Sequence, residues 1–245
     1  MNALTQVDRF GPGFLGLLNM CGNLLLPRAC AGCDRPDCVL CPSCAALFQQ
    51  TESFPAPGYA CGSGYACAVY AGPVRQAILG WKDHGDEEVG AQLARAIARL
   101  AVSLRPLYER VSLPDLVIVP APSSAASMRR RGRAHLRPLA QAVAHQLTAV
   151  GLPAQAQLAL TMSAVKGKAV ELHSSSARAR RVSGHIQVKA GSQIAGRSVI
   201  VVDDIVTTGS TLRQCGAALS GAGARPILSL ALARAGRHQA STDLL

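Results

Sequence analysis

Aromatic side chains are scarce in this chain of 245 residues, where Phe, Tyr and Trp together make up 4% of the sequence. Aliphatic residues and alanine dominate the other hydrophobic residues. A chain of this length and composition can bury a substantial core, which argues against wholesale disorder. Long hydrophobic runs are also missing: no stretch of 18 consecutive apolar residues occurs, so we expect no membrane span.

The most apolar stretch, Phe14–Leu26, is interrupted by two Gly and two Asn residues, and it has neither a basic leader nor a clean cleavage site. It predicts a short amphipathic helix that packs on the body of the protein, with a helix on a membrane surface as the alternative. Two common phosphate-binding patterns are missing from the stretch Val199–Thr211. It contains neither GxxxxGK followed by Ser or Thr nor GxGxxG, so P-loop and dinucleotide-binding sites are disfavoured there.

Acidic residues are scarce in one segment. Residues 125–190 contain eleven basic residues and a single acidic one, Glu171, whereas residues 1–124 contain nine basic and ten acidic residues. Nearly all of the formal net charge of +11 therefore lies in residues 125–190. Such a local positive field attracts polyanions, either phosphorylated metabolites or nucleic acid, and a solvated basic surface is the alternative.

Cysteine, in contrast, is abundant: nine are present, five of them between Cys30 and Cys44. An odd number with tight Cys-x-x-Cys pairs is typical of metal binding in a reducing cytosol, so we expect a cytoplasmic protein. The turns Cys30-x-x-Cys33 and Cys41-x-x-Cys44 can aim four thiolates at one point and predict a closed structural zinc site. Cys38 leaves an alternative open, because Cys38-x-x-Cys41 has the same spacing. The other cysteines are expected to be buried small apolar residues: Cys21, Cys61, Cys67 and Cys215.

Hydrophobic periodicity predicts an α/β fold. The expected strands are Ala66–Tyr70, Leu116–Val119, Gln157–Leu160, Ser198–Val202 and Pro226–Ala233. The expected helices are Val74–Trp81, Glu87–Leu104, Gly132–Val150 with a start or kink near Pro138, and Ser210–Ala222. Apolar strands that alternate with helices indicate a parallel sheet covered on both faces, with ligands at the carboxyl ends of the strands.

Three regions follow from this pattern. Residues 1–66 contain the N-terminal helix, the cysteine cluster and a Pro- and Gly-rich connector, Phe54–Gly64. Residues 67–236 form the α/β domain, and residues 237–245 form a frayed tail. Within the domain, residues 163–183 are rich in Ser, Lys and Arg and predict a long mobile loop.

The stretch Val199–Thr211 carries the clearest chemistry and reads VIVVDDIVTTGST. An apolar strand ends in two carboxylates, Asp203 and Asp204, and a turn rich in Thr, Gly and Ser leads into a helix. Backbone N–H groups, hydroxyls and the helix N-terminus favour a phosphate, and Gly209 lets the backbone approach it closely. Carboxylates beside that phosphate accept hydrogen bonds from hydroxyls, so the stretch indicates a phosphosugar. A pair of acids that only caps the turn is the alternative.

These thirteen residues closely resemble the signature of type I phosphoribosyltransferases, which bind phosphoribosyl pyrophosphate. The resemblance implies the fold of that family, with Asp203 and Asp204 on the ribose hydroxyls. It also implies Mg²⁺ bound between pyrophosphate and ribose oxygens. The resemblance assigns the 5′-phosphate to the loop formed by Thr207, Thr208, Gly209, Ser210 and Thr211.

Further segments resemble the ComF family, whose members join a small zinc module to a phosphoribosyltransferase domain and are linked to natural competence. The segments are YAGPVRQAILGWK (Tyr70–Lys82), PDLVIVPAP (Pro114–Pro122) and RRRGRAHL (Arg129–Leu136), together with the cysteine pairs. The resemblance covers roughly residues 20–235. It implies single-stranded DNA and competence proteins as partners.

The resemblance also places pyrophosphate at the loop after the Leu116–Val119 strand. The residues expected on the pyrophosphate side are Ala121, Pro122, Ser123, Arg129 and Arg131. Lys82 is expected to point at the ligand beside a buried Trp81. Lys166 and Lys168 in the predicted mobile loop are expected to close over the site.

Three ComF patterns differ in this chain. Relatives show Arg-Gly-Phe-Asn-Gln where this sequence reads Arg131-Gly-Arg-Ala-His135, and their mobile-segment patterns are replaced at Ala169–Leu172 and Arg178–Arg181. The changes favour ligand binding over turnover. His135 and His173 are interpreted as surface histidines, with the replacement of lost polar contacts as the alternative.

Three functions remain open at this point. The first is phosphoribosyl transfer to an unknown acceptor, and the second is a non-catalytic single-stranded-DNA or partner-binding module of the competence machinery that uses residues 125–190. The third is a regulator that senses a nucleotide. Residues 111–196 contain no Phe, Tyr or Trp, so DNA contacts there would depend on phosphates and on salt.

Overall fold

The computed structural model describes residues 28–111, 116–163 and 185–236. Within these ranges, no helix combines the length and the apolar character that a bilayer span requires. Several predicted features lie outside the described residues: the helix Phe14–Leu26, Cys21, the tail 237–245, and residues 164–183 of the predicted loop with Lys166, Lys168 and His173.

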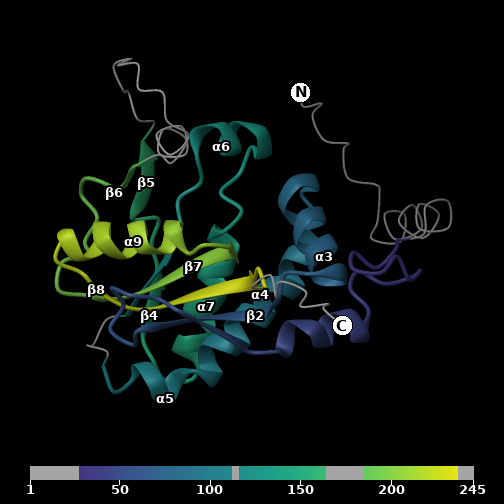
Figure 1. Ribbon diagram of the computed structural model, residues 1–245, viewed down its shortest axis with the longest axis horizontal. Helices are drawn as coiled ribbons and strands as arrows, with labels where there is room; N and C mark the ends of the chain where they lie inside the picture. Colours follow the sequence, from purple (N-terminus) through teal and green to yellow (C-terminus); the bar gives the residue numbers. More distant parts are fainter. Residues whose placement is uncertain (1–27, 112–115, 164–184, 237–245) are drawn as a thin grey trace, which may run out of the picture.

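A six-stranded sheet forms the centre of the molecule (Figure 1). Its order is β1 (Glu52–Pro55), β2 (Ser63–Val69), β8 (Arg225–Arg234), β7 (Ser198–Val206), β3 (Leu116–Pro120) and β4 (Ala154–Ala156). Only β1 is antiparallel to its neighbour, and the other pairs are parallel. All five residues of β3 are buried, as expected for a strand that is covered on both faces.

Helices cover both faces of the sheet, which confirms the predicted α/β architecture. Figure 1 shows α4 (Glu87–Ser103) and α7 (Arg137–Ala149) on one face and α9 (Ser210–Gly221) on the other. The first of these helices, α4, is preceded by Asp86, whose side chain accepts a hydrogen bond from the N–H of Val89 at 3.2 Å. This cap satisfies one of the free N–H groups at the start of the helix.

Shorter elements complete the described part of the chain. The helices α3 (Gly72–His84) and α6 (Ala125–Arg131) lie near the carboxyl end of β7. The strands β5 (Leu160–Ser163) and β6 (His185–Val188) form a separate antiparallel pair. The remaining elements are α2 (Pro42–Ala46), the 3-10 helix η1 (Leu47–Gln49) and α5 (Arg105–Tyr108).

Two predicted boundaries in the middle of the chain are wrong. The helix predicted from Gly132 begins only at Arg137, so the predicted start or kink near Pro138 is confirmed as a start. Gly132 is left-handed with φ 65° and ends α6, while Pro138 lies in the first turn of α7. The strand predicted at Gln157–Leu160 is instead the connection from β4 into β5. β4 is an edge strand with a mostly exposed, polar and alanine-rich sequence, so it gives little hydrophobic signal.

The Pro- and Gly-rich connector predicted at Phe54–Gly64 is shorter than expected. Its ends belong to β1 and β2, which pair in antiparallel register from Glu52 opposite Ala66 to Pro55 opposite Ser63. β2 then lies beside β8 in the main sheet. The division of the chain near residue 66 stays a prediction.

Candidate functional site

The central strand β7 is longer than predicted, and its extra length forms the edge on which the candidate site lies. β7 pairs with β3 only as far as Val202 but with β8 as far as Val206. Asp203 and Asp204 are therefore strand residues beyond the end of β3, rather than residues that follow the strand. Because successive side chains of a strand point to opposite faces, the two carboxyls leave β7 in different directions.

A pocket of about 330 Å³ lies at this end of β7. Both carboxyls line it, together with Thr211 from the start of α9 and with residues 122–124 after β3. The fold adds residues from α3, α6, the segment after α6, β5 and β7: Lys82, Ser127, Arg131, His135, Leu136, Met162 and Ile205. Acidic, basic and hydroxyl side chains thus face one another across a small space.

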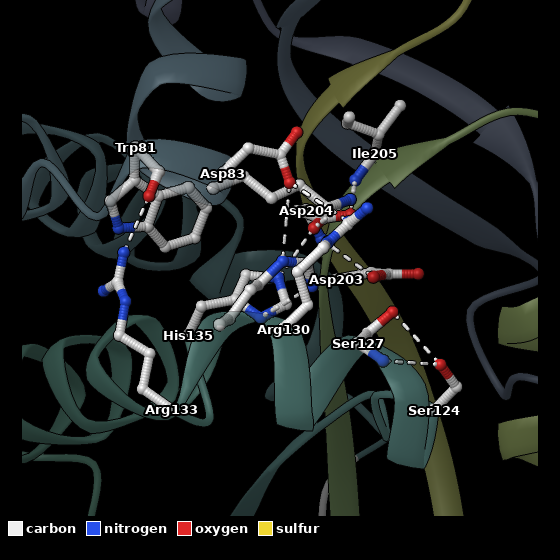
Figure 2. A network of polar contacts seen from close by, with 12 residues as sticks. Trp81, Asp83, Ser124, Ser127, Arg130, Arg133, His135, Asp203, Asp204 and Ile205 are labelled. Carbon is white, nitrogen blue, oxygen red and sulfur yellow. Dashed lines mark hydrogen bonds and ion pairs between the residues drawn. The ribbon is translucent and has the colours of Figure 1, made fainter.

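The Asp204 carboxylate is held by three hydrogen-bonding or charged groups. Its Oδ2 lies 2.6 Å from Nζ of Lys82 and 2.8 Å from Nε2 of His135, a contact drawn in Figure 2. Its Oδ1 accepts a hydrogen bond from the N–H of Ile205 at 2.7 Å. Burial raises the pKa of Asp204, but the hydrogen bond from His135 and the charge of Lys82 outweigh burial and hold that pKa below its usual value.

Asp203 has the opposite electrostatic environment. Its Oδ1 accepts a hydrogen bond from the N–H of Asp204 at 2.9 Å, and the residue is 9% exposed. Burial and the nearby charge of Asp204 raise the pKa of Asp203 to about 7. The pocket therefore presents one carboxyl that stays ionised and one that changes protonation near neutral pH.

The interpretation of His135 as a surface residue is wrong. His135 is 3% exposed, and its ring packs against the indole of Trp81 with centroids 5.3 Å apart. Arg133 supports this contact by donating a hydrogen bond to the carbonyl of Trp81 at 2.7 Å (Figure 2). The chain turns from α6 into α7 between α3 and β7, so a residue in a very basic local sequence is covered by distant elements. The expected burial of Trp81 is confirmed, at 1% exposed.

The loop from Thr207 to Thr211 has a conformation that suits an anion. Gly209 is left-handed with φ 70°, and α9 begins at the next residue. Arg213, which the sequence reasoning did not single out, donates a hydrogen bond to the carbonyl of Thr208 at 2.8 Å and so brings a cation to the loop. Within the loop, Thr211 lines the pocket. The exposed side chains of the loop are Thr207, Thr208 and Ser210.

Only some of the residues predicted on the pyrophosphate side line the pocket. The three that line the pocket are Pro122, Ser123 and Arg131. Ala121 lines an adjoining cavity of about 230 Å³, and Arg129 is exposed on α6 without lining either cavity. Ser124 also lines the pocket, although the prediction omits it. Its Oγ accepts a hydrogen bond from the N–H of Ser127 at 3.1 Å and caps α6.

Four thiols near the N-terminus meet at one point, as the spacing predicts. The Sγ atoms of Cys30, Cys33, Cys41 and Cys44 all lie within 4.8 Å of one another, and those of Cys33 and Cys41 are 3.7 Å apart. A tetrahedral zinc with Zn–S bonds of about 2.3 Å places its sulfurs about 3.8 Å apart, so the cluster fits a zinc ion. Burial raises the pKa of Cys30, but hydrogen bonds from the backbone, including Cys41 N–H at 3.3 Å, outweigh it and lower that pKa to about 6. The thiolate form of Cys30 is therefore favoured, whereas burial and the neighbouring thiols raise the pKa of Cys44.

Cys38 lies outside the four-thiol cluster, and its thiol donates to the carbonyl of Arg35 at 3.5 Å. The structure thus brings together the turns Cys30-x-x-Cys33 and Cys41-x-x-Cys44, as predicted, and not Cys38-x-x-Cys41. Among the other described cysteines, Cys67 and Cys215 are buried as expected, whereas Cys61 is partly exposed.

The four-thiol cluster also abuts the helices next to the pocket. A Cβ at Gly32 would lie 3.2 Å from the Cβ of Pro73, at the start of α3. The guanidinium of Arg28 pairs with the carboxylate of Asp86, which caps α4, at 2.5 Å. Because α3 carries Lys82, the cysteine-rich segment from Arg28 to Cys44 is in contact with the helix that supplies a cation to the pocket.

Comparison with known proteins gives a match in the C-terminal half of the chain. Residues 137–243 match the family described as phosphoribosyl transferase domain. No curated protein matches the chain significantly.

Several solved structures are similar to this chain at low sequence identity. Phosphoribosylpyrophosphate synthetase from Mycobacterium smegmatis is 16% identical, with a TM-score of 0.34 over 56% of this chain and 33% of that chain. Purine phosphoribosyltransferase from Pyrococcus horikoshii is 23% identical, with a TM-score of 0.31 over 57% of this chain and 70% of that chain. An adenine phosphoribosyltransferase is 14% identical, with a TM-score of 0.34 over 78% of this chain and 88% of that chain. This chain thus spans about a third of the synthetase.

The matched segment begins at α7 and contains β7 with both carboxyls, the loop after it and α9. The match to the phosphoribosyl transferase domain family therefore covers the carboxyl pair of the pocket and the loop after it.

Proposed function

We propose that the pocket at the end of β7 binds phosphoribosyl pyrophosphate, or a related phosphosugar or nucleotide, together with Mg²⁺. The observation that carries this proposal is a convergence: Asp203, Asp204, Thr211 and the Ser123–Ser124 pair all line one pocket. Carboxyls accept hydrogen bonds from sugar hydroxyls, and amides at a helix start bind phosphate.

The three parts of such a ligand have separate partners in this proposal. The ribose hydroxyls contact Asp203 and Asp204, and the 5′-phosphate binds the loop 207–211. The pyrophosphate lies toward residues 121–123, Arg129 and Arg131, and a bound Mg²⁺ would neutralise part of its negative charge. Guanidinium groups pair well with phosphate oxygens, which supports the place of Arg131 in this scheme.

Calorimetric titration with phosphoribosyl pyrophosphate and Mg²⁺ tests this function. We expect the wild type to bind, and we expect Asp203→Asn and Asp204→Asn each to raise the Kd about tenfold or more, because each removes an acceptor for a sugar hydroxyl. Glu109→Gln is the matched control, since Glu109 pairs with Arg105 at the surface away from the pocket. Equal heats from the wild type and both Asn variants would contradict the site.

Phosphoribosyl transfer is the reaction that this ligand would support. Pyrophosphate is displaced from C1 of the ribose by an acceptor, and the positive charge that develops on the sugar needs electrostatic support. A screen for pyrophosphate release with nucleobases as acceptors separates an enzyme from a protein that only binds the ligand.

The basic segment supports a second candidate function. Arg129 and Arg130 are exposed on α6, within the positively charged residues 125–190. With the four-thiol cluster and the phosphoribosyl transferase domain, this charge supports the ComF family and a competence-associated protein that binds single-stranded DNA or a protein partner. In that case DNA affinity falls steeply with salt, and it persists in Asp203→Asn.

A further inference from the structure

His135 contacts charged side chains through both of its ring nitrogens. Nε2 lies 2.8 Å from Oδ2 of Asp204, and Nδ1 lies 3.4 Å from Nη1 of Arg131. A guanidinium only donates hydrogen bonds, and an ionised carboxylate only accepts them. Nδ1 is therefore the acceptor and Nε2 the donor, so these two neighbours select the neutral tautomer that carries its hydrogen on Nε2.

The orientation of this imidazole is fixed from several sides. The indole of Trp81 packs against it at an angle of 57°, and the side chain is 3% exposed. Arg131 is itself only 7% exposed and has Nε 3.6 Å from Oδ1 of Asp83. Figure 2 shows Trp81 and Asp83 from α3 beside the residues of α6 and β7. The ring therefore has little freedom to turn away from Asp204.

A directional donor matters because of what remains free on the Asp204 carboxylate. An ionised carboxylate offers about four acceptor positions. Lys82 and His135 both contact Oδ2, while the N–H of Ile205 contacts Oδ1, which leaves acceptor capacity on Oδ1. The ammonium of Lys82 is a point charge on a flexible stem, whereas the imidazole N–H donates along one line. Of these two side-chain contacts, only the second is directional, and it complements the backbone N–H of Ile205 on the other oxygen in defining how the carboxylate is rotated.

We propose that His135 is a positioning residue whose Nε2–H fixes the rotation of the Asp204 carboxylate and keeps Oδ1 available to a ligand hydroxyl. The effect on phosphoribosyl pyrophosphate rests on the function proposed above. The tautomer and the fixed carboxylate belong to the free protein and are testable without any ligand.

Substitutions of His135 separate a positioning role from simple filling of space. In His135→Gln the amide N–H₂ reaches the place of Nε2, whereas in His135→Asn it stops near the place of Nδ1, too far from Asp204. We expect the Kd for phosphoribosyl pyrophosphate with Mg²⁺ to rise about tenfold or more in the Asn and Ala variants, and to stay within about threefold of wild type in the Gln variant. Thermal melts of all three variants verify that they fold.

Two NMR measurements on the free protein complete the test. Nitrogen-15 shifts of the His135 ring in the wild type are expected to show hydrogen on Nε2 and none on Nδ1. Carboxyl carbon-13 titration is expected to give a higher pKa for Asp204 in His135→Ala and His135→Asn, and a near wild-type pKa in His135→Gln. The other groups that face this carboxyl are the same in every variant: Lys82 from α3, Arg131 from α6 and Asp203 from β7.

The outcomes distinguish this role from the proposed function. If the wild type fails to bind phosphoribosyl pyrophosphate while Nε2 is protonated and the Gln variant preserves the Asp204 titration, the proposed function fails and the positioning role stands. A ring with its hydrogen on Nδ1, or a Gln variant that matches the Ala variant in the Asp204 titration, overturns the positioning role.

Discussion

Asp203 and Asp204 are adjacent residues of β7 whose surroundings favour opposite protonation states. Burial and the charge of Asp204 favour the neutral form of Asp203, while His135 and Lys82 favour the charged form of Asp204. In the unfolded chain both carboxyls have ordinary pKa values near 4. At neutral pH, ionisation of Asp203 therefore lowers the stability of the folded protein, whereas ionisation of Asp204 raises it. The free energy of unfolding of single Asn variants can measure both effects.

Asp203→Asn is expected to stabilise the protein above neutral pH. Because the pKa of Asp203 is raised to about 7 on folding, its contribution to stability is present at low pH and is lost as the pH rises through 7. The Asn variant has no such loss, so its free energy of unfolding should exceed that of the wild type by about 1–3 kcal/mol near pH 8, with a smaller difference near pH 5. Urea unfolding at the two pH values measures this.

Asp204→Asn is expected to change stability in the opposite direction. The lowered pKa of Asp204 stabilises the folded protein above pH 4, and this contribution is lost as the pH falls toward 2. The Asn variant should therefore be less stable than the wild type near pH 8. Equal pH profiles for the two variants would show that the carboxyls do not differ as described.

The residues of the pocket differ in how far the sequence could predict them. Asp203, Asp204 and Thr211 belong to one continuous pattern, so local sequence is enough to place them together. His135 lies 69 positions from Asp204, and nothing in its local sequence distinguishes it from a surface histidine. Its burial depends on α3 and β7 closing around the turn before α7, which is a tertiary effect. Lys82 differs in this respect, because the resemblance of Tyr70–Lys82 to the ComF segment already indicates that it points at the ligand, and it lines the pocket.

At the scale of elements, the packing of α3 on α4 depends on a glycine. A Cβ at Gly90 of α4 would lie 2.6 Å from Nε1 of Trp81, so any larger residue must push the indole away. Trp81 in turn packs against His135. A larger residue at position 90 would therefore displace Trp81, and through Trp81 it would affect the position of His135 in the pocket.

Gly90→Ala is expected to lower the free energy of unfolding by about 1–3 kcal/mol, because overpacking displaces a buried indole. Gly80→Ala on α3 is the control, since a Cβ there meets no atom within 4 Å. That substitution should raise stability by up to about 1 kcal/mol through helix propensity. Chemical denaturation followed by Trp fluorescence measures both. A Gly90→Ala variant as stable as Gly80→Ala would contradict the close contact.

Elements with strong periodicity are the ones that the sequence predicts well. α4 and α9 start at or within a residue of their predicted positions, and the apolar strands β3, β7 and β8 are found where expected. β1 and β4 were not identified, because edge strands with exposed faces and nearby Gly or Pro carry little hydrophobic signal. The end of β7 was also missed, because two acidic residues interrupt its apolar pattern.

At the scale of the whole molecule, the four-thiol cluster packs against the start of α3, the helix that carries Lys82 into the pocket. We expect Cys41→Ser to reduce bound zinc well below one ion per chain and to lower the melting temperature, because a closed site needs all four thiolates. Cys38→Ser should keep the zinc content of the wild type, since Cys38 lies outside the cluster. Elemental analysis with thermal melts measures both effects. Loss of zinc in both variants would show that Cys38 is a ligand.

The position of β8 between β2 and β7 has a consequence for synthesis on the ribosome. β2 is synthesised early and β8 late, yet the parallel partner of β2, from Gly64 to Val69, is β8. Until Arg225–Arg234 leaves the exit tunnel, the growing polypeptide holds two incomplete half-sheets with exposed apolar edges. The central sheet should therefore be completed only after β8 is released from the ribosome.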